Sequence, residues 1–476
     1  MRRKPQNRIL HQITVEDYAA EGKSIARVDG KVIFIDGAVP GDVIDIRLHK
    51  SKKDWAEGKA IYYHKYASNR VTPFCDHFGI CGGCKWQMLP YEDQLRFKER
   101  EVASNLQRIG KIELPQPLPI AGSSDTKNYR NKLEFTFSNR RYLTVEEMEE
   151  RKKLPEEVRF PYEPAAGFHV PGYFDKVIDI QNCYLQHEPT NAIRNFVRDF
   201  AIKNNYTFYN LRAHEGWLRT MIVRVATTGE VMINICFGYD EPLAREALLD
   251  AIVKTFPSVT TLLYTINTKK NDSINDLQPQ IYSGNGYIKE RLGKYLFKIG
   301  PKSFFQTNTK QAEKLYEITR NFAALTGKET LYDLYCGTGS IGIFCSDAAK
   351  KIVGVEVIKE AIDDAHINAA LNDIDHAHFF AGDVIDICTN EFFQIHGRPD
   401  VIITDPPRAG MHAALVQKLL DIEAPRIVYV SCNPATQARD LQLLDTKYRV
   451  EQLQAIDLFP HTHHIENVAA LVLKHG

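Results

Sequence analysis

The chain has 476 residues, enough for more than one domain, because a single hydrophobic core stops growing at roughly 250–300 residues. Its composition, 44% hydrophobic and 25% charged, is that of a folded globular protein and excludes a disordered one. Basic and acidic residues number 60 each, so no overall positive charge indicates a nucleic-acid partner. Residues 1–111 nevertheless hold 20 Lys and Arg against 14 Asp and Glu, a local excess of +6.

No run of eighteen or more apolar residues is present, and the opening MRRKPQNRIL lacks the apolar core of a signal peptide. These features predict a cytoplasmic protein without a membrane partner. The nine cysteines are too few for a secreted disulfide framework in so long a chain, and their clustering favours metal binding or catalysis.

Residues 8–65 alternate apolar and polar positions in short runs separated by Asp-Gly and Pro-Gly turns. This pattern predicts a small closed β-barrel of the oligonucleotide-binding type. The segment GKSIARVDGKVIFIDGAVPGD resembles the TRAM module of RNA-modifying enzymes, so residues 1–68 are expected to form an RNA-binding barrel. Two interpretations of the basic side chains in this region stay open: they belong to a solubilising loop, or they form a patch that contacts phosphate. These side chains are Arg47, Lys50, Lys52 and Lys53.

Four cysteines form a candidate metal site at the start of a central domain, residues 69–300. Cys75, Cys81 and Cys84 lie on one glycine-rich loop, CDHFGICGGC, and Cys183 follows about a hundred residues later. A loop that wraps one corner of an iron–sulfur cluster and a distant fourth ligand would suit this spacing. Four thiolates also suit a closed zinc site, and the spacing alone does not separate the two.

The rest of the central domain is predicted to begin with a linking helix over residues 91–109 and to continue as a β-rich region from residue 128. Residues 138–166 form a charged segment longer than a hairpin connection requires. Its acidic middle, residues 146–157, would repel phosphate, so we interpret the segment as a solvated insertion. A role in fitting a partner or substrate is the alternative.

Residues 301–476 alternate short apolar strands with helical segments, which predicts a doubly wound, mainly parallel sheet. The first strand runs into a glycine-rich turn with Gly337, Gly339 and Gly342, and the second ends at Glu356. A carboxylate at that distance can accept both hydroxyls of an adenosine ribose, in NAD or in S-adenosylmethionine. Cys432, at the end of a later strand, favours covalent chemistry over hydride transfer.

Five segments occur in an informative order: FFQTN, DLYCGTGSIG, DPPR, SCNP and HTHHIENVA. Together they resemble the RNA uracil-C5 methyltransferase family, which makes 5-methyluridine with S-adenosylmethionine, and YRNKLEF and GFH extend the match into the central domain. The resemblance implies a seven-stranded Rossmann-like methyltransferase domain and a 4Fe–4S cluster on Cys75, Cys81, Cys84 and Cys183. It also implies a set of S-adenosylmethionine contacts: Gln306, Tyr335, Glu356 and Asp405, with Asp383 near the adenine. Tyr335 departs from the phenylalanine of many relatives, a change that preserves ring packing.

Carbon 5 of uracil is a weak nucleophile until a thiolate adds to carbon 6. Cys432 is the predicted nucleophile, and the helix expected after Pro434 would favour its thiolate. Glu466 matches the base that the family uses to remove the carbon 5 proton. His461, His463 and His464 crowd the same loop, where we expect packing or RNA contact and assign no metal. Cys236, Cys345 and Cys388 lie in apolar contexts and are expected to fill the core.

The four-cysteine site resembles the ribosomal branch of the family, so 23S ribosomal RNA is the first expected substrate and transfer RNA the second. The base must come from a loop or be flipped out of a helix, because stacking hides carbon 6. Two other interpretations stay open: an amino-methyltransferase with a DPPY-type motif, and a non-catalytic RNA-binding iron–sulfur protein. We expect a monomer.

Overall fold

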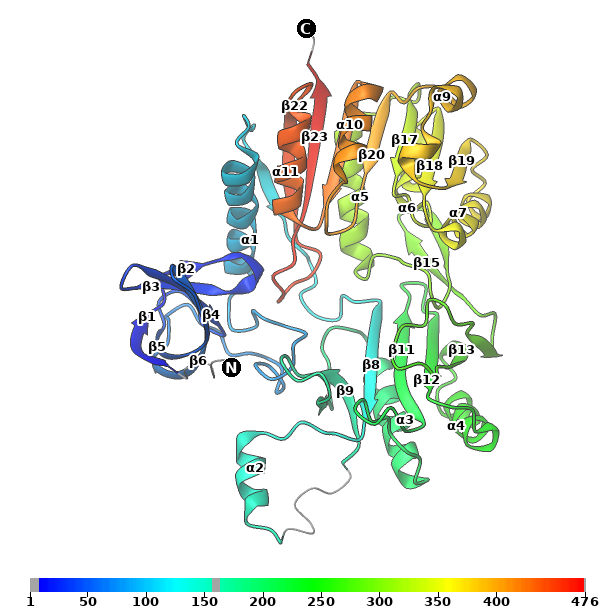
Figure 1. The fold of residues 1–476 in the computed structure, drawn as a ribbon. Coiled ribbons are helices and arrows are strands. Elements are labelled where there is room, and N and C mark those ends of the chain that lie inside the picture. Colours follow the sequence, from blue (N-terminus) through cyan, green and yellow to red (C-terminus); the bar gives the residue numbers. More distant parts are fainter. Residues whose placement is uncertain (1–7, 156–162, 475–476) are drawn as a thin grey trace.

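The computed structural model describes residues 8–155 and 163–474, which form three β-containing domains (Figure 1). The first is a strongly curved sheet in the order β1-β5-β6-β4-β3-β2. Its strands are β1 (Ile9–Thr14), β2 (Asp17–Tyr18), β3 (Ser24–Val28), β4 (Lys31–Asp36), β5 (Val43–Ser51) and β6 (Trp55–Lys65). Alternate residues such as Ile33, Ile35, Ile44 and Ile46 are fully buried, which confirms the predicted period-two pattern.

The central domain contains a seven-stranded sheet in the order β10-β9-β8-β11-β12-β13-β14. Its strands are β8 (Lys132–Ser138), β9 (Ala165–His169), β10 (Val177–Asp179), β11 (Leu218–Val225), β12 (Val231–Phe237), β13 (Val259–Ile266) and β14 (Gln280–Ser283). Helices α3 (Thr190–Lys203) and α4 (Pro242–Thr255) pack together and against this sheet. A hairpin of β15 (Ile288–Leu292) and β16 (Tyr295–Ile299) then contacts helices of the C-terminal domain.

The C-terminal domain is a sheet in the order β19-β18-β17-β20-β21-β23-β22-β7, parallel except at β23, with helices on both faces. Its strands are β17 (Thr330–Leu334), β18 (Lys351–Glu356), β19 (Ala377–Ala381), β20 (Val401–Thr404), β21 (Arg426–Ser431), β22 (Tyr448–Ile456) and β23 (Glu466–Leu473). Its helices are α5 (Thr309–Ala323), α6 (Ser340–Phe344), α7 (Lys359–Leu371), α8 (Val384–Ile387), α9 (Asn390–His396), α10 (Ala413–Ile422) and α11 (Pro434–Leu444). All seven predicted strands are present.

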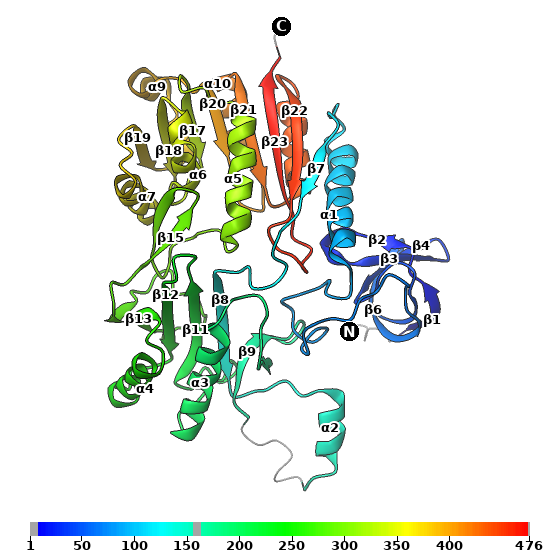
Figure 2. The same cartoon turned by 180° about the vertical axis from the view of Figure 1, so that it is seen from behind.

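An eighth strand, β7 (Leu118–Ala121), was not predicted and comes from the N-terminal third of the chain. It pairs in parallel with β22, and helix α1 (Tyr91–Asn105) beside it packs against α11, as both cartoon views show (Figure 2). The expected linking helix is therefore a covering helix of the C-terminal sheet. Residues 91–121 complete this sheet although they lie far from it in sequence.

The expected insertion projects from the central domain as a long loop that contains helix α2 (Val145–Lys152). A capping box starts the helix, because the Thr144 side chain accepts a hydrogen bond from Glu147 N and the Glu147 side chain accepts one from Thr144 N. No residue of α2 is buried, as a solvated insertion requires. Residues 156–162 of the expected insertion lie outside the described residues.

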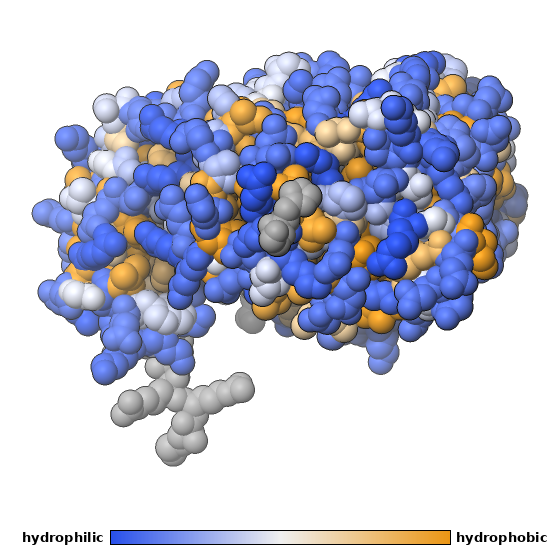
Figure 3. All heavy atoms as spheres, turned by 90° about the horizontal axis from the view of Figure 1, so that it is seen from above, coloured by the Kyte–Doolittle hydropathy of each residue, from blue (hydrophilic) through white to orange (hydrophobic). Residues whose placement is uncertain are grey.

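Within residues 8–155 and 163–474, no helix combines the length and the apolar character that crossing a membrane needs. The face seen from above is mainly hydrophilic, with hydrophobic residues in small separate groups (Figure 3).

Candidate active site

The glycine-rich turn lies at the carboxyl edge of the C-terminal sheet, between β17 and α6. Tyr335, Gly337 and Gly339 have φ values of 61°, 52° and 77°, in the left-handed region that glycine adopts most easily. A Cβ on Gly339 would stand 2.9 Å from the Phe379 ring, so this position also needs glycine for space. Nothing lies within 4 Å of the Cβ position of Gly337, which leaves its backbone open to a ligand.

Glu356 ends the neighbouring strand β18, and two backbone groups fix its carboxylate. Gly337 N donates to Oε2 at 3.2 Å and Ile358 N donates to Oε1 at 3.0 Å. Each oxygen keeps a lone pair for a further donor. The side chain therefore fits the two hydroxyls of an adenosine ribose, as the motif predicts.

The other predicted cofactor contacts come from three separate segments. Asp383 follows β19 and caps α8, because its side chain accepts a hydrogen bond from Ile385 N at 2.8 Å. Burial raises the pKa of Tyr335, and the negative charge of Asp383 adds a smaller rise. Asp405 follows β20. Gln306 lies just before α5, where Asn131 Nδ2 donates to its carbonyl oxygen at 2.9 Å, so the central domain holds this segment.

Cys432 and Glu466 are neighbours across the antiparallel pair β21 and β23. The last residue of β21, Ser431, pairs with Asn467, so the next residue on each strand places Cys432 opposite Glu466. This juxtaposition depends on strand register between segments 34 residues apart. It could not be derived from the sequence motifs alone.

Burial is the largest influence on the pKa values of Cys432 and Glu466. It raises the pKa of Cys432 to about 11, and the nearby carboxyl groups of Glu466 and Asp405 add to the rise. Burial likewise raises the pKa of Glu466 well above its usual value, with Asp405 adding to it, and raises that of Asp405 to about 7. That the helix beginning at Pro434 favours a Cys432 thiolate stays a prediction, and burial and the two carboxyl groups act on the pKa of Cys432 in the opposite direction.

Arg408 opposes these effects and was not assigned a role from the sequence. The positive charge of its guanidinium lowers the pKa values of both Cys432 and Glu466. Asn433 Nδ2 and Thr436 Oγ1 donate to the Arg408 carbonyl oxygen at 3.0 and 3.2 Å, which ties the two loops together. The sequence contained a signal for this role, because Arg408 is the last residue of the DPPR segment.

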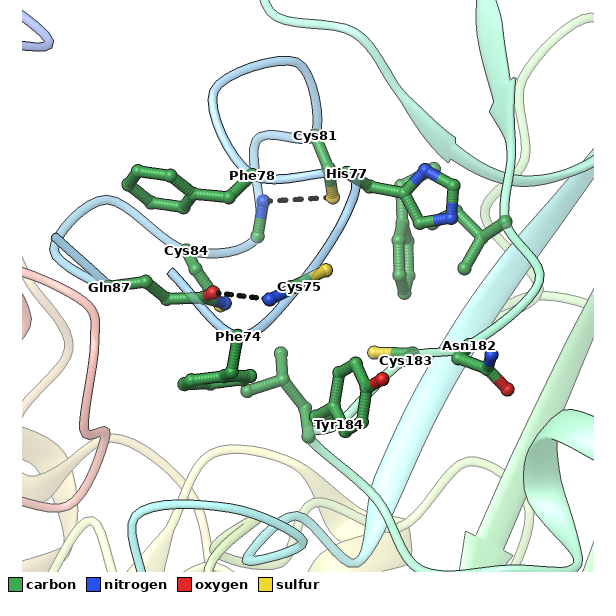
Figure 4. A pocket seen from close by; sticks show the side chains of 14 residues that line it. Phe74, Cys75, His77, Phe78, Cys81, Cys84, Gln87, Asn182, Cys183 and Tyr184 are labelled. Carbon is green, nitrogen blue, oxygen red and sulfur yellow. Dashed lines mark hydrogen bonds between the residues drawn. The ribbon is translucent and has the colours of Figure 1, made fainter. Parts of the chain in front are cut away.

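The four cysteines of the candidate metal site line one pocket between the cysteine loop, residues 75–84, and the segment of residues 180–185 (Figure 4). Burial raises the pKa of Cys81 to about 12 and of Cys84 to about 11, and it also raises those of Cys75 and Cys183. Among the residues that the structure describes, no three His, Cys, Asp or Glu side chains form a group that could hold a metal ion. The sulfur atoms surround a mainly apolar space.

The three histidines before β23 pack within the loop. His461 is 7% exposed and lies edge-on to the Phe74 ring, with 5.0 Å between ring centroids, while His463 and His464 lie against each other at 4.2 Å. Burial lowers the pKa values of His461 and His464 to about 4 and that of His463 to about 3. The cysteines expected in the core are confirmed there, at 0–3% exposure: Cys236, Cys345 and Cys388.

Comparison with known proteins assigns these segments to families. Residues 277–474 match the model of the tRNA (uracil-5-)-methyltransferase family, and residues 11–61 match the TRAM domain. A Bacteroides thetaiotaomicron protein named as an uncharacterized RNA methyltransferase is 53% identical over 459 residues, covering 96% of this chain and 100% of the relative. The chain belongs to the RNA uracil-5 methyltransferase family. It is thus an RNA methyltransferase, of a family that depends on S-adenosylmethionine.

Two further relatives extend the comparison of this RNA uracil-5 methyltransferase over nearly its whole length. A Porphyromonas gingivalis protein, also named as an uncharacterized RNA methyltransferase, is 49% identical over 463 residues, covering 96% of this chain and 99% of the relative. The crystal structure of the Pyrococcus abyssi tRNA (uracil-54, C5)-methyltransferase, in complex with S-adenosyl-L-homocysteine, superposes with a TM-score of 0.73 and 27% identity. That match covers 97% of this chain and 100% of the archaeal one.

Proposed function

We propose that this protein methylates carbon 5 of a uridine in RNA through a covalent bond between Cys432 and carbon 6 of the ring. The observation that carries the proposal is the register of β21 and β23, which sets Cys432 opposite Glu466, two strands along the sheet from the strand that leads into the glycine-rich turn. A thiol and a carboxyl group side by side at a cofactor edge suit a reaction that needs a nucleophile first and a base afterwards.

The Cys432 sulfur gives an electron pair to carbon 6, and the ring electrons move to carbon 5 and the carbonyl oxygen. S-adenosylmethionine, when bound, supplies the methyl group that carbon 5 takes. The Glu466 carboxylate then removes the carbon 5 proton, the double bond re-forms, and the sulfur leaves carbon 6 with its electron pair. Arg408 favours the thiolate in the first step and the carboxylate in the last.

Gln306, Tyr335, Glu356, Asp383 and Asp405 are the proposed contacts of S-adenosylmethionine. Glu356 would accept the ribose hydroxyls, and the open Cβ position of Gly337 leaves space for the cofactor against the turn. The negative charge of Asp405 would face the positively charged end of the cofactor, which would lower the raised pKa of this carboxyl group on binding.

The four cysteines are the proposed ligands of a 4Fe–4S cluster with a structural or RNA-facing role. Thiolates spread around an apolar pocket suit a cluster, whose ligands bind different iron atoms, better than one ion. The test is to purify the protein anaerobically and count iron, sulfide and zinc. We expect about four irons and four sulfides per chain, lost in Cys81→Ser; one zinc per chain would replace the cluster with a zinc site.

The proposed substrate is 23S ribosomal RNA, on the resemblance of the four-cysteine site, with transfer RNA as the alternative favoured by the archaeal relative. Mass spectrometry of both RNAs from a deletion strain distinguishes the two. Loss of 5-methyluridine from transfer RNA, with ribosomal RNA unchanged, would establish the alternative.

Covalent chemistry is tested with RNA that carries 5-fluorouridine, because fluorine at carbon 5 leaves no proton for the base to remove. We expect the wild-type protein and S-adenosylmethionine to form a gel-stable adduct, and Cys432→Ala to form neither adduct nor product. Full activity of Cys432→Ala would instead indicate an amino-methyltransferase. Absence of any wild-type adduct or methyl transfer would favour a non-catalytic RNA-binding protein.

A further inference from the structure

The loop of residues 457–465 joins β22 to β23 and ends immediately before Glu466, so it determines where the carboxyl group of the proposed base begins. Distant parts of the chain hold this loop. Lys98 of α1 donates to Asp457 Oδ1 at 2.6 Å, Asn308 Nδ2 donates to the Leu458 carbonyl at 2.8 Å, and Tyr129 Oη donates to the Pro460 carbonyl at 2.9 Å.

His461 is the residue of this loop that contacts both α1 and the segment after the cysteine loop. Gln94 of α1, fully buried, accepts from His461 N at 2.8 Å and lies 3.1 Å from His461 Nδ1 through its amide nitrogen. The same amide nitrogen lies 3.0 Å from the carbonyl oxygens of Trp86 and Leu89. One buried amide therefore joins the loop before Glu466 to the segment that follows the cysteine loop.

That segment also contacts His461 directly. Lys85 N and Trp86 N both donate to the His461 carbonyl oxygen, at 2.8 and 3.0 Å. Lys85 follows Cys84 in the chain, and the Phe74 ring that lies against His461 lines the same pocket as the four cysteines. The candidate metal site and the loop before Glu466 thus share a set of short contacts.

His461 also has a φ of 63°, a backbone conformation that costs a non-glycine residue free energy unless its surroundings fix it. The hydrogen bonds on both sides of this peptide supply that restraint. Losing them would let the loop relax and move the first residue of β23.

We propose that Gln94 and the segment that follows the cysteine loop, Lys85 and Trp86, position Glu466 by acting through His461. The inference rests on the proposed function, in which Glu466 removes the carbon 5 proton while the Cys432–carbon 6 bond breaks. Addition of Cys432 precedes this step and uses a different segment. A displaced loop therefore slows release of the product more than it slows formation of the adduct.

Gln94→Met tests this, because it keeps the length of the side chain and removes the hydrogen bonds to His461. We expect adduct formation on 5-fluorouridine RNA close to wild type. On ordinary uridine RNA, product release should slow about tenfold to a hundredfold, since small displacements of a catalytic group cost that much, and the covalent complex should accumulate. Gln94→Glu keeps an acceptor for His461 N and should restore part of the release rate.

Asn234→Leu is the matched control, since Asn234 is also a buried amide, 3% exposed, but lies in the central sheet and accepts from Thr265 Oγ1. It should change melting temperature without separating the two rates. His461→Ala and His461→Asn provide a second pair: the alanine should accumulate the covalent complex, and the asparagine, which tolerates left-handed φ, should release product faster.

The inference would be overturned if Gln94→Met released product at the wild-type rate. It would also be overturned if the Gln94 and His461 variants slowed adduct formation and product release equally. Failure of the wild-type protein to form the 5-fluorouridine adduct would overturn the proposed function instead.

Discussion

Arg408 carries a positive charge that acts on both reacting side chains of the proposed site. It lowers the pKa of Cys432, which burial and two carboxyl groups hold at about 11. Nucleophilic addition requires the thiolate, so Arg408 controls how much of the enzyme is reactive at a given pH.

Replacing Arg408 with glutamine should therefore move the pH profile of adduct formation to higher pH by about one pH unit, because the Cys432 pKa rises when the neighbouring charge is removed. The rate on 5-fluorouridine RNA, measured from pH 6 to pH 10, checks this. Arg408→Lys keeps a positive charge and is the control. Superimposable profiles for the wild type and Arg408→Gln would show that the charge has no influence on the nucleophile.

At the scale of elements, periodicity and glycine placement predict the structure well where the information is local. All seven strands of the C-terminal domain and the turn before α6 follow from short apolar runs and from glycines that need positive φ. Strand β7 carries no such signal, because it is a four-residue segment, half exposed at Leu118, that becomes a strand only when paired with β22. The pairing of Cys432 with Glu466 and the hydrogen bonds that hold His461 also depend on long-range contacts, so local patterns do not predict them.

Helix α2 gives an element-scale prediction about the insertion. Thr144→Ala removes the side chain that caps the helix, at a cost of about 1 kcal/mol to the helix. Hydrogen exchange across residues 145–152 should become faster, while methylation should stay unchanged because no side chain of α2 is buried against the rest of the protein. A clear loss of methylation would support the alternative interpretation, in which the insertion fits a partner or substrate.

At the scale of the whole molecule, the barrel, the cysteine loop, α1 and the central domain all meet the loop before β23. A Cβ on Gly22 of the barrel would stand 2.9 Å from His463 Cβ, so the barrel packs closely there. The buried ion pair of Lys98 and Asp457, with both side chains at 0% exposure, holds the loop to α1. This junction makes the three domains interdependent.

Lys98→Met should lower the free energy of unfolding by about 3–5 kcal/mol, because it leaves the Asp457 carboxylate buried without its partner. Urea unfolding followed by circular dichroism measures the change. Lys310→Met is the control, since the exposed pair of Lys310 and Asp125 should contribute less than about 1 kcal/mol. Equal midpoints for the two variants would contradict a structural role for the buried pair.

The pairing of β7 with β22 has a consequence for how the protein is made. During translation the barrel emerges first and can fold early, but α1 and β7 must wait until the final strands leave the ribosome before they find their partners. A fragment beginning near residue 301 would leave the edge of β22 uncovered and prone to pair with other chains. The C-terminal sheet is therefore complete only when β22, near the end of the chain, pairs with β7 from its first third.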